Sequence, residues 1–556
     1  MVLGGCRVGR TARALPAGSS VRTVTREAGS AWLGRTRGWD IGAAAASVAV
    51  ALLLFTRFTL GDVLQRDESI YAYAGQQMAR GVPMYSSIFD PKTPLAGMIA
   101  GLAAGIARLL SINDLTFIRL TFFVLAVVTV LAMYLLGRVL WDSPLAGLVT
   151  ATVFAAFRGF ALDALTGPNA KTPGILAAVV AMVLMVRRQW FWAAFAGSVA
   201  FLVWQPLLIY AAVAVVSAGI AAGPGKRIRS LAVAVAGSVI PVAVVALYFL
   251  VAGALDRLVV AGFVFPVVGL SRGHQTLAGR LRHIADVVAS GYGRSGQLFW
   301  LGTALLVALL GWQLVRRRDG LRDRLADPMI SVVGVTFLLV LAFSLSDFQG
   351  YSDLYPLLPY AALGFGGTAA AVLAAVRDRP GMLRAATATA LVAVVALTAL
   401  TGLSFARERV RHGGLATQRA DACALDLVLG ARGTLYALGN PTQLVLTHRR
   451  NPDRFVYLNS AVDKWRINHT PGGMAGWQRE IQAAHPTVIV QSTWHSRQAR
   501  LMHQWLTATY DHAHLGRWQV FLAPGVRARA ERAGVLLRGA KGDGPDAVAN
   551  PAPGRC

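Results

Sequence analysis

Two adjacent carboxylates, Asp67 and Glu68, stand a few residues after a hydrophobic segment that is long enough to cross a bilayer. A poorly hydrated carboxylate at a membrane boundary is costly, so such a pair indicates a function. Partial burial raises the proton affinity of a carboxylate, which suits a general base acting on a hydroxyl or amine. The structural alternative is that the pair begins a helix and offsets its dipole.

Two further clusters combine a carboxylate with a lysine. Asp90 and Lys92 stand in a proline-rich loop, and Asp163 and Lys171 flank a Gly-Pro turn. Lys92 is either a salt-bridging or snorkelling residue or a contact for the phosphate of an anionic lipid carrier. The segment with Asp163 and Lys171 is either a plain turn or part of a site. Arg158 falls inside a predicted span, where an arginine needs a partner or a polar cavity.

Two later loops add further site candidates. Arg272 shares a long outer loop with Arg280 and Arg282. Outer loops are poor in arginine, so this loop favours binding of phosphate or pyrophosphate, with an amphipathic surface helix as the alternative. Tyr351 and Asp353 enter a proline-punctuated span. Tyr351 suits an aromatic belt, whereas Asp353 has no evident structural need.

Membrane spans must bring these residues together. Apolar runs of about 20 residues recur through the first 400 positions of the 556-residue chain, which predicts a mainly α, polytopic bundle of about 11 spans. A shorter apolar helix at 95–110 is predicted to be interfacial or re-entrant. The predicted spans are 41–60, 116–137, 144–162, 173–187, 190–205, 206–222, 231–252, 297–315, 329–345, 355–376 and 385–404.

The charge pattern orients these spans. With the N-terminus in the cytoplasm, the short basic loops all lie inside, and the acidic site candidates share the outer face. The net charge is +27, from 54 Lys and Arg against 27 Asp and Glu. Because the basic residues alternate with spans, this charge reflects membrane orientation and does not indicate nucleic-acid binding. The predicted location is the plasma membrane, with the C-terminal domain extracytoplasmic.

Four parts are predicted along the chain. They are a disordered cytoplasmic tail (1–39), a transmembrane domain (40–404) whose outer loop 61–115 is catalytic, an extracytoplasmic α/β domain (405–524) and a disordered tail (525–556). Within the small α/β domain, the apolar patterns predict strands at 434–438, 455–458, 487–490 and 518–522 and helices at 418–429, 477–484 and 497–507.

The order of these motifs resembles that of the multi-span GT-C glycosyltransferases that use polyprenyl-phosphate sugars. These include dolichyl-phosphate-mannose-type protein mannosyltransferases and bacterial lipid A aminoarabinose transferases. The resemblance covers about residues 40–404. It rests on Asp67-Glu68-Ser69-Ile70-Tyr71-Ala72-Tyr73-Ala74, Gly81-Val82-Pro83-Met84-Tyr85, Pro91-Lys92-Thr93-Pro94-Leu95, Arg119 and Tyr355-Pro356-Leu357-Leu358-Pro359.

The resemblance implies an inverting transfer of a sugar from a polyprenyl-phosphate donor to a cell-envelope acceptor, which would be a glycan, a lipid or a protein. Asp67 would be the catalytic base or the acceptor-binding carboxylate, with Glu68 beside it. Lys92, Lys171 and Arg272 would contact the donor phosphate. No cofactor is expected, although the Asp67-Glu68 pair offers oxygen ligands for a divalent metal. The alternative is a transporter or flippase of a lipid-linked or anionic substrate.

Overall fold

The computed structural model of the protein describes residues 37–269, 276–316, 327–404, 414–459 and 461–539. The chain divides into two compact units, residues 1–42 and residues 43–556. The candidate site residues belong to the second unit. Arg272, most of the predicted N-terminal tail and the end of the predicted C-terminal tail lie outside the described residues.

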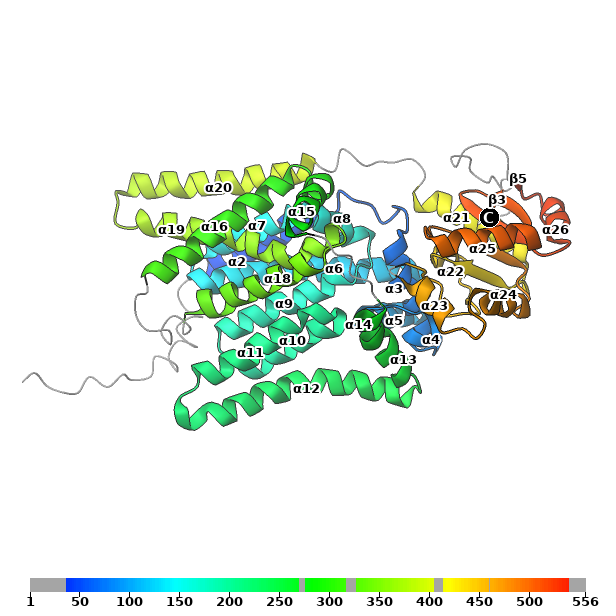
Figure 1. The fold of residues 1–556 in the computed structure, drawn as a ribbon. Helices are drawn as coiled ribbons and strands as arrows, with labels where there is room; N and C mark the ends of the chain where they lie inside the picture. The colour runs from blue at the N-terminus through cyan, green and yellow to red at the C-terminus, as the bar shows by residue number, and fades with distance from the viewer. Residues whose placement is uncertain (1–36, 270–275, 317–326, 405–413, 460, 540–556) are drawn as a thin grey trace, which may run out of the picture. The chain divides into compact units, whose positions relative to one another are not determined.

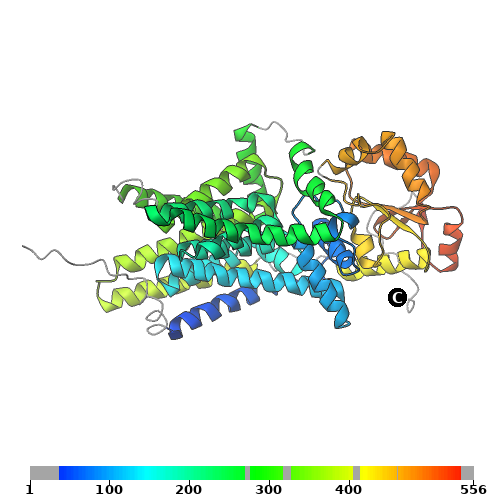
Figure 2. The ribbon, with the colours of Figure 1, turned by 90° about the horizontal axis from the view of Figure 1, so that it is seen from below.

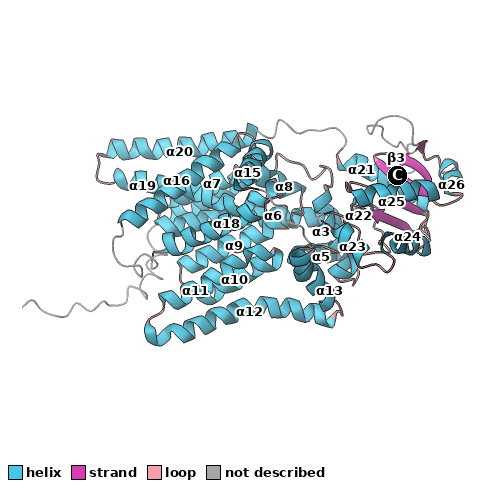
Figure 3. Cartoon of the chain, viewed as in Figure 1, coloured by secondary structure: helices cyan, strands magenta, loops and turns pink. Residues whose placement is uncertain are grey.

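The described part of the chain up to residue 404 is helical wherever it forms regular structure (Figures 1 and 3). Its elements are α2 (Arg37–Phe55), α3 (Arg66–Met78), α4 (Met84–Ser87), α5 (Leu95–Leu109), α6 (Asp114–Trp141), α7 (Pro144–Ala155), α8 (Arg158–Thr166), α9 (Lys171–Val186), α10 (Trp190–Val203), η1 (Gln205–Leu207), α11 (Leu208–Ala221), η2 (Pro224–Lys226), α12 (Arg227–Val251), α13 (Leu255–Val259), η3 (Val260–Val264), α14 (Phe265–Val268), α15 (Leu277–Tyr292), α16 (Ser295–Arg316), η4 (Met329–Gly334), α18 (Val335–Ser346), η5 (Tyr351–Leu357), α19 (Leu358–Ala375) and α20 (Gly381–Ser404).

Each predicted span falls on a helix, which confirms the mainly α, multi-pass fold. Within the described residues, 7 helices are long and apolar enough to cross a membrane, and the bent pair α7–α8, with 71° between its halves, raises this to 8. The predicted spans 173–187, 190–205 and 206–222 fall on α9, α10 and η1–α11, which are apolar but shorter. About 20 residues are needed to cross a bilayer without help from neighbours.

The first long loop after α2 folds into α3, α4 and α5. The sequence predicts a helix at 95–110, and α5 is that helix. Packing between α3 and α5 is close because Gly75 has no side chain: a Cβ atom there would lie 2.7 Å from the carbonyl carbon of Ala100. This contact fixes α3, which carries the acidic pair, against α5.

Residues 415–539 form the predicted small α/β region. Its elements are α21 (Leu415–Leu429), β1 (Leu435–Leu438), α22 (Thr442–Leu446), α23 (Val462–Asn468), α24 (Gly473–Ala483), β2 (Val488–Gln491), α25 (Arg497–Thr509), β3 (Asp511–Leu515), β4 (Trp518–Leu522), α26 (Val526–Arg532) and β5 (Arg538–Gly539). The strand order is β1-β2-β4-β3-β5, with β1 and β2 parallel and the other pairs antiparallel. Helices lie on both faces of this sheet (Figure 2).

The structure differs from the predicted α/β pattern in several places, and the short helices α22 and α23 are among the elements that were not predicted. Residues 455–458 are buried but belong to no strand. Phe455 stacks on Phe89 in the loop between α4 and α5, Tyr457 contacts Asp67 on α3, and Val456 O accepts one hydrogen bond from Gly439 N after β1. The polar strand β3 carries too few apolar residues to be predicted. Regular structure also continues past residue 525, where the Arg-rich composition predicts disorder, because Val526 and Ala530 bury one face of α26. The other predicted domain boundaries stay predictions.

The α/β region packs directly on the first long loop. The ring of Phe89 stacks on Phe455 with 4.8 Å between centroids. At the start of α3, Ser69 Oγ donates a hydrogen bond to Asn440 Oδ1 at 2.8 Å, and Leu64 N donates to Gln418 Oε1 at 2.7 Å. Contacts between segments more than 350 residues apart therefore hold the N-terminal end of α3, where the acidic pair stands.

Candidate active site

A cavity of about 600 Å³, which we call the α3 cavity, opens beside the first turn of α3. Six of the predicted site residues line it: Asp67, Asp90, Lys92, Lys171, Tyr351 and Asp353. They come from α3, from the loop before α5, from the start of α9 and from η5. The predicted convergence of these distant segments is therefore present in the structure.

Asp67 faces the α3 cavity, and its side chain is 55 % exposed there. Tyr457 of the α/β region donates a hydrogen bond to Asp67 Oδ1 at 3.0 Å, and Arg66 Nε lies 3.5 Å from the same oxygen. Burial by the surrounding protein acts to raise the pKa of Asp67. The charges of Lys92 and Arg66 and the Tyr457 hydrogen bond outweigh that effect, so the pKa lies below its usual value.

The expectation that a partly desolvated carboxylate here has a raised proton affinity is therefore wrong for Asp67. The reason is that the cations beside it were not evident from the acidic motif. Asp67 is ionised at neutral pH, and it is the negative charge that the α3 cavity presents next to Lys92.

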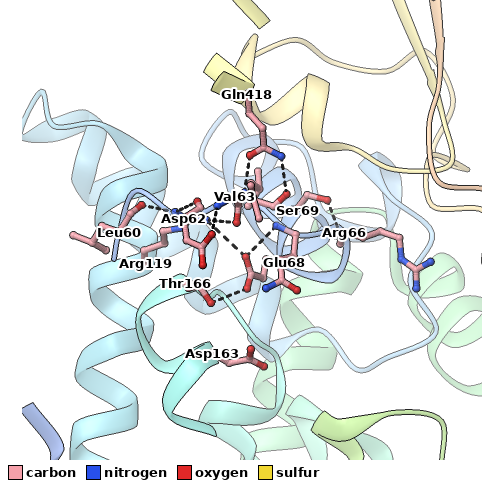
Figure 4. A network of polar contacts seen from close by, with 12 residues as sticks. Leu60, Asp62, Val63, Arg66, Glu68, Ser69, Arg119, Asp163, Thr166 and Gln418 are labelled. Atoms are coloured by element: carbon pink, nitrogen blue, oxygen red, sulfur yellow. Dashed lines mark hydrogen bonds and ion pairs between the residues drawn. The ribbon is translucent and has the colours of Figure 1, made fainter. Parts of the chain in front are cut away.

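Glu68, its neighbour, points the other way and does not line the α3 cavity. Its side chain is 5 % exposed and accepts hydrogen bonds from Gln65 N at 3.2 Å and Thr166 Oγ1 at 3.1 Å. Burial raises the pKa of Glu68 to about 8, although Arg119, 3.7 Å away, acts to lower it. Glu68 thus joins the start of α3 to α8 and is placed to position the helix (Figure 4).

Arg119 completes this buried network from α6. Its guanidinium donates hydrogen bonds to the carbonyl oxygens of Leu60 at 2.5 Å, Asp62 at 3.0 Å and Val63 at 3.2 Å (Figure 4). An arginine within an apolar helix needs such partners, and here the chain entering α3 supplies them. Arg119 therefore fixes the segment that delivers Asp67 to the cavity.

Asp90 and Lys92 form the second charged group in the wall. Lys92 N lies 3.4 Å from Asp90 Oδ1, and Lys92 Nζ lies 5.6 Å from the centre of the Tyr71 ring. Burial raises the pKa of Asp90 to about 6, and the charge of Lys92 limits the rise. Burial acts to lower the pKa of Lys92, but Asp90 and Asp67 outweigh it and raise the pKa. Lys92 is therefore a stable ammonium group.

Lys171 brings a second ammonium group to the same cavity. Its Nζ forms an ion pair with Asp353, donates a hydrogen bond to Ser352 Oγ at 3.0 Å and lies 4.9 Å from the centre of the Trp204 ring. These contacts join the first turn of α9 to η5. Asp353, which has no evident role in the sequence, is thus the partner of Lys171.

Asp163 is buried behind the cavity wall and does not line it. Its carboxylate accepts hydrogen bonds from Tyr351 Oη at 2.8 Å, Tyr355 Oη at 2.6 Å and Asn169 Nδ2 at 2.6 Å. These bonds tie α8 to η5 and so hold Tyr351, which does line the cavity. Arg158 also lies away from the cavity, with Nη1 3.5 Å from Ser290 O.

Several lining residues were not among the predicted ones. Tyr457 lies 390 residues after Asp67, and no local pattern signals their contact. Arg66 directly precedes the acidic pair, and this position in the sequence could have identified it as a residue of the same site. Gln205 donates hydrogen bonds to the carbonyl oxygens of Pro91 and Gly262, both at 2.7 Å, and so fixes the backbone next to Lys92.

The rest of the wall is largely apolar. Phe263, Pro266 and Val267 come from η3 and α14, and Phe343 comes from α18. Val267 is also 80 % exposed at the molecular surface. The α3 cavity therefore combines a group of charges with an apolar side that continues to the surface. This arrangement suits an amphiphile with a charged head and a hydrocarbon chain.

Two solved structures are similar to this chain over most of its length. The crystal structure of ArnT from Cupriavidus metallidurans in the apo state matches with a TM-score of 0.57 and 14% identity, covering 87% of this chain and 98% of that chain. The structure of ArnT bound to undecaprenyl phosphate matches with a TM-score of 0.58 and 15% identity, covering 88% and 99%.

No model of a protein family matches the sequence, and no curated protein matches it. The structural likeness extends over both the helical part and the α/β region, since it covers more than four fifths of this chain. The resemblance found in the sequence motifs is confirmed at the level of fold: the fold of this chain is similar to that of ArnT.

Proposed function

We propose that the protein is a membrane glycosyltransferase that moves a sugar from a polyprenyl-phosphate donor to a cell-envelope acceptor, with inversion at the anomeric carbon. One observation carries the proposal: the ionised carboxylate of Asp67 and the ammonium groups of Lys92 and Lys171 line one cavity that also has an apolar side. Support comes from the shared fold, because ArnT binds undecaprenyl phosphate.

In this reaction an acceptor hydroxyl oxygen bonds to the anomeric carbon while the bond from that carbon to the donor phosphate oxygen breaks. The hydroxyl proton passes to Asp67, and polyprenyl phosphate leaves with the bonding electron pair. A carboxylate of low pKa is a weak base towards a resting hydroxyl. The hydroxyl becomes acidic as its oxygen bonds to carbon, so we expect proton transfer late in the step.

Lys92 and Lys171 have the charge to stabilise the leaving phosphate. Charge-assisted hydrogen bonds from preorganised cations are worth more where water is excluded, as in this partly enclosed cavity. Arg66 adds a third cation to the wall. The proposal needs no metal or other cofactor, because these side chains supply the positive charge.

We place the reaction at the outer face of the plasma membrane, with the N-terminus in the cytoplasm and the α/β domain outside. The support is the distribution of basic residues among the short loops. Polyprenyl phosphate and the lipid bilayer are then the first partners, and the acceptor reaches Asp67 from the extracytoplasmic side.

The test is complementation of a deletion strain, followed by profiling of envelope glycans and lipids. Wild type should restore a missing sugar, and Asp67→Asn should be expressed normally without restoring it. Asp256→Asn, which changes an exposed carboxylate outside the cavity, is the matched control and should restore it. Normal products with Asp67→Asn would exclude the enzyme and favour the transporter.

A binding measurement separates the donor site from the chemistry. Lys92→Gln should bind undecaprenyl phosphate about 10-fold or more weakly, because a charge-assisted hydrogen bond contributes roughly 1.5–3 kcal/mol. Lys464→Gln, an exposed lysine of the α/β region, is the control and should bind as wild type. Equal affinity of Lys92→Gln and wild type would remove Lys92 from the phosphate site.

A further inference from the structure

A second cavity, of about 980 Å³, lies in the α/β region, and we call it the sheet cavity. The segments that follow β1 and β2 form much of its wall, with Asn440 and Gln443 after β1 and Ser492 after β2. These two strands are the parallel pair of the sheet. Crevices at the carboxyl ends of parallel strands are where open α/β sheets commonly bind ligands.

The wall of the sheet cavity is rich in side-chain amides. None of its lining residues in the described chain is Asp or Glu. An amide donates and accepts hydrogen bonds at once, which matches the hydroxyl groups of a sugar. The indole rings of Trp494 and Trp518 add apolar surface to the wall, as the faces of a sugar ring require. The lining amides are those of Gln418, Asn440, Gln443, Gln491, Gln504 and Gln519, of which Gln418, Asn440 and Gln491 also form hydrogen bonds within the protein.

Two side chains in this wall have polar atoms without a hydrogen-bond partner in the part of the chain that the structure describes. The Gln443 side chain is 0 % exposed, and neither its Oε1 nor its Nε2 has a hydrogen-bond partner among the described residues. Ser492 Oγ is also buried without one. Buried polar groups are normally satisfied, so unpaired ones in a cavity wall indicate a ligand that the wall is built to bind.

The strands β2 and β4, which carry the lining residues Gln491, Trp518 and Gln519, have no free edge, whereas β1 is an edge strand of the sheet. In the sheet order, β2 lies between β1 and β4, and β4 lies between β2 and β3. A peptide that binds by adding a strand needs an open edge, so β2 and β4 cannot accept one. At the edge strand β1, Ala437 N already donates to Asn451 Oδ1 at 2.7 Å, and Gly439 N after it donates to Val456 O at 2.8 Å. Recognition here therefore comes from side chains, and the combination of amides with the indole rings of Trp494 and Trp518 suits a saccharide.

The sheet cavity adjoins the α3 cavity. Arg66 lines both, and its Nε lies 3.5 Å from the Asp67 carboxylate. A chain of sugars held at the ends of β1 and β2 would extend past Arg66 towards Asp67. We infer that the sheet cavity binds the saccharide part of the acceptor, which makes the acceptor a glycan. This inference rests on the proposed function.

The test is calorimetric titration of the full-length protein in lipid nanodiscs with mannotriose, an arabinofuranose trisaccharide and a Ser/Thr-rich hexapeptide. We expect at least one trisaccharide to bind and the hexapeptide not to bind. Binding of the hexapeptide alone, or of none of the three, overturns the inference.

Variants locate the site. Gln491 and Gln519 are cross-strand partners on β2 and β4, and the double variant Gln491→Ala/Gln519→Ala should bind the trisaccharide about 10-fold or more weakly. Gln443→Leu should also weaken binding while keeping or raising the melting temperature, because it removes unpaired buried polar atoms. Gln482→Ala, on the exposed face of α24, is the control. If the double variant and Gln443→Leu both bind the trisaccharide as wild type does, the sheet cavity is not the saccharide site.

The two proposals fail separately. Asp67→Asn should retain trisaccharide affinity and lose transfer in the complementation test. If Asp67→Asn retained transfer and bound the trisaccharide normally, the proposed role of Asp67 in transfer would be wrong. The proposed saccharide site in the sheet cavity would still stand. If Asp67→Asn lost transfer but wild type bound no trisaccharide, the proposed saccharide site would be wrong. The proposed role of Asp67 in transfer would still stand.

Discussion

At the scale of single residues, the adjacent carboxylates Asp67 and Glu68 have opposite environments. Asp67 faces a cavity with Lys92 and Arg66 near it, and its pKa falls below the usual value. Glu68 is buried, and its pKa rises to about 8. The first is suited to chemistry with an incoming acceptor. The second is a positioning residue, because its contacts run to the backbone of Gln65 and to Thr166.

We predict that Glu68 makes the stability of the protein depend on pH. Its pKa rises from the ordinary 4.5 to about 8 on folding, so the folded protein binds its proton more tightly. The free energy of unfolding should therefore fall as pH rises through this window, by up to about 1.4 kcal/mol for each unit of pKa difference. Melting temperatures of wild type and Glu68→Gln across the window measure the effect.

In Glu68→Gln the amide keeps the shape of the side chain and removes its titration. The variant should lose part of the pH dependence of wild type, while Glu68→Ala should be less stable at every pH because it leaves Arg119 without this partner. Parallel melting curves for wild type and Glu68→Gln across the pH range would contradict the assignment of a raised pKa to Glu68.

At the scale of elements, close helix contacts hold the parts that carry the site. α16 and α19 approach each other at Gly302 and Gly364, where a Cβ on Gly364 would lie 2.0 Å from the carbonyl oxygen of Gly302. Small residues permit such contacts between membrane helices. α19 continues directly from η5, which carries Asp353, so this contact also supports the partner of Lys171.

Gly364→Ala should therefore destabilise the protein by about 1–3 kcal/mol, the usual range for overpacking a tight contact. Thermal unfolding in detergent measures the shift. Gly311→Ala is the matched control on α16, because no atom of the described residues lies within 4 Å of a Cβ built there. That control should be neutral or slightly stabilising, since alanine favours a helix over glycine. Equal melting temperatures for both variants would contradict the contact.

At the scale of the whole molecule, the α/β region contributes directly to the cavity of the helical part. Tyr457 Oη donates to Asp67 at 3.0 Å, and Gln418 and Asn440 hold the N-terminal end of α3. The α/β region is therefore more than an attached binding domain, because the electrostatics of the carboxylate depend on it.

Removal of this hydrogen bond should shift the pH dependence of transfer. The bond from Tyr457 lowers the pKa of Asp67, so Tyr457→Phe should raise that pKa and move the acid limb of the pH–rate profile to higher pH. We also expect a fall in rate of about 10-fold from one lost hydrogen bond. Tyr510→Phe, elsewhere in the same region, is the control. An unmoved acid limb would show that Tyr457 does not act on Asp67.

The sequence predicts much of this protein because hydrophobic length and charge bias are local signals. Each predicted span falls on a helix, and the strands β1, β2 and β4 follow from short apolar runs. The strand predicted at 455–458 is absent from the structure, and the reason is informative. The apolar residues of this segment indicate a strand, but Phe455 uses its ring to pack on Phe89, a contact that no local pattern contains.

The sequence by itself determined the helical architecture, the motif order and the segments that supply charged residues to one site. Only the tertiary structure decided which charged residues line the cavity. Successive residues on a helix point about 100° apart, so Asp67 and Glu68 necessarily face different surroundings. Glu68 contacts Arg119 in the protein interior, and Asp67 contacts Tyr457 in the wall of the cavity. Both contacts exist only after distant segments have packed together, so the sequence alone does not show which carboxylate lines the cavity.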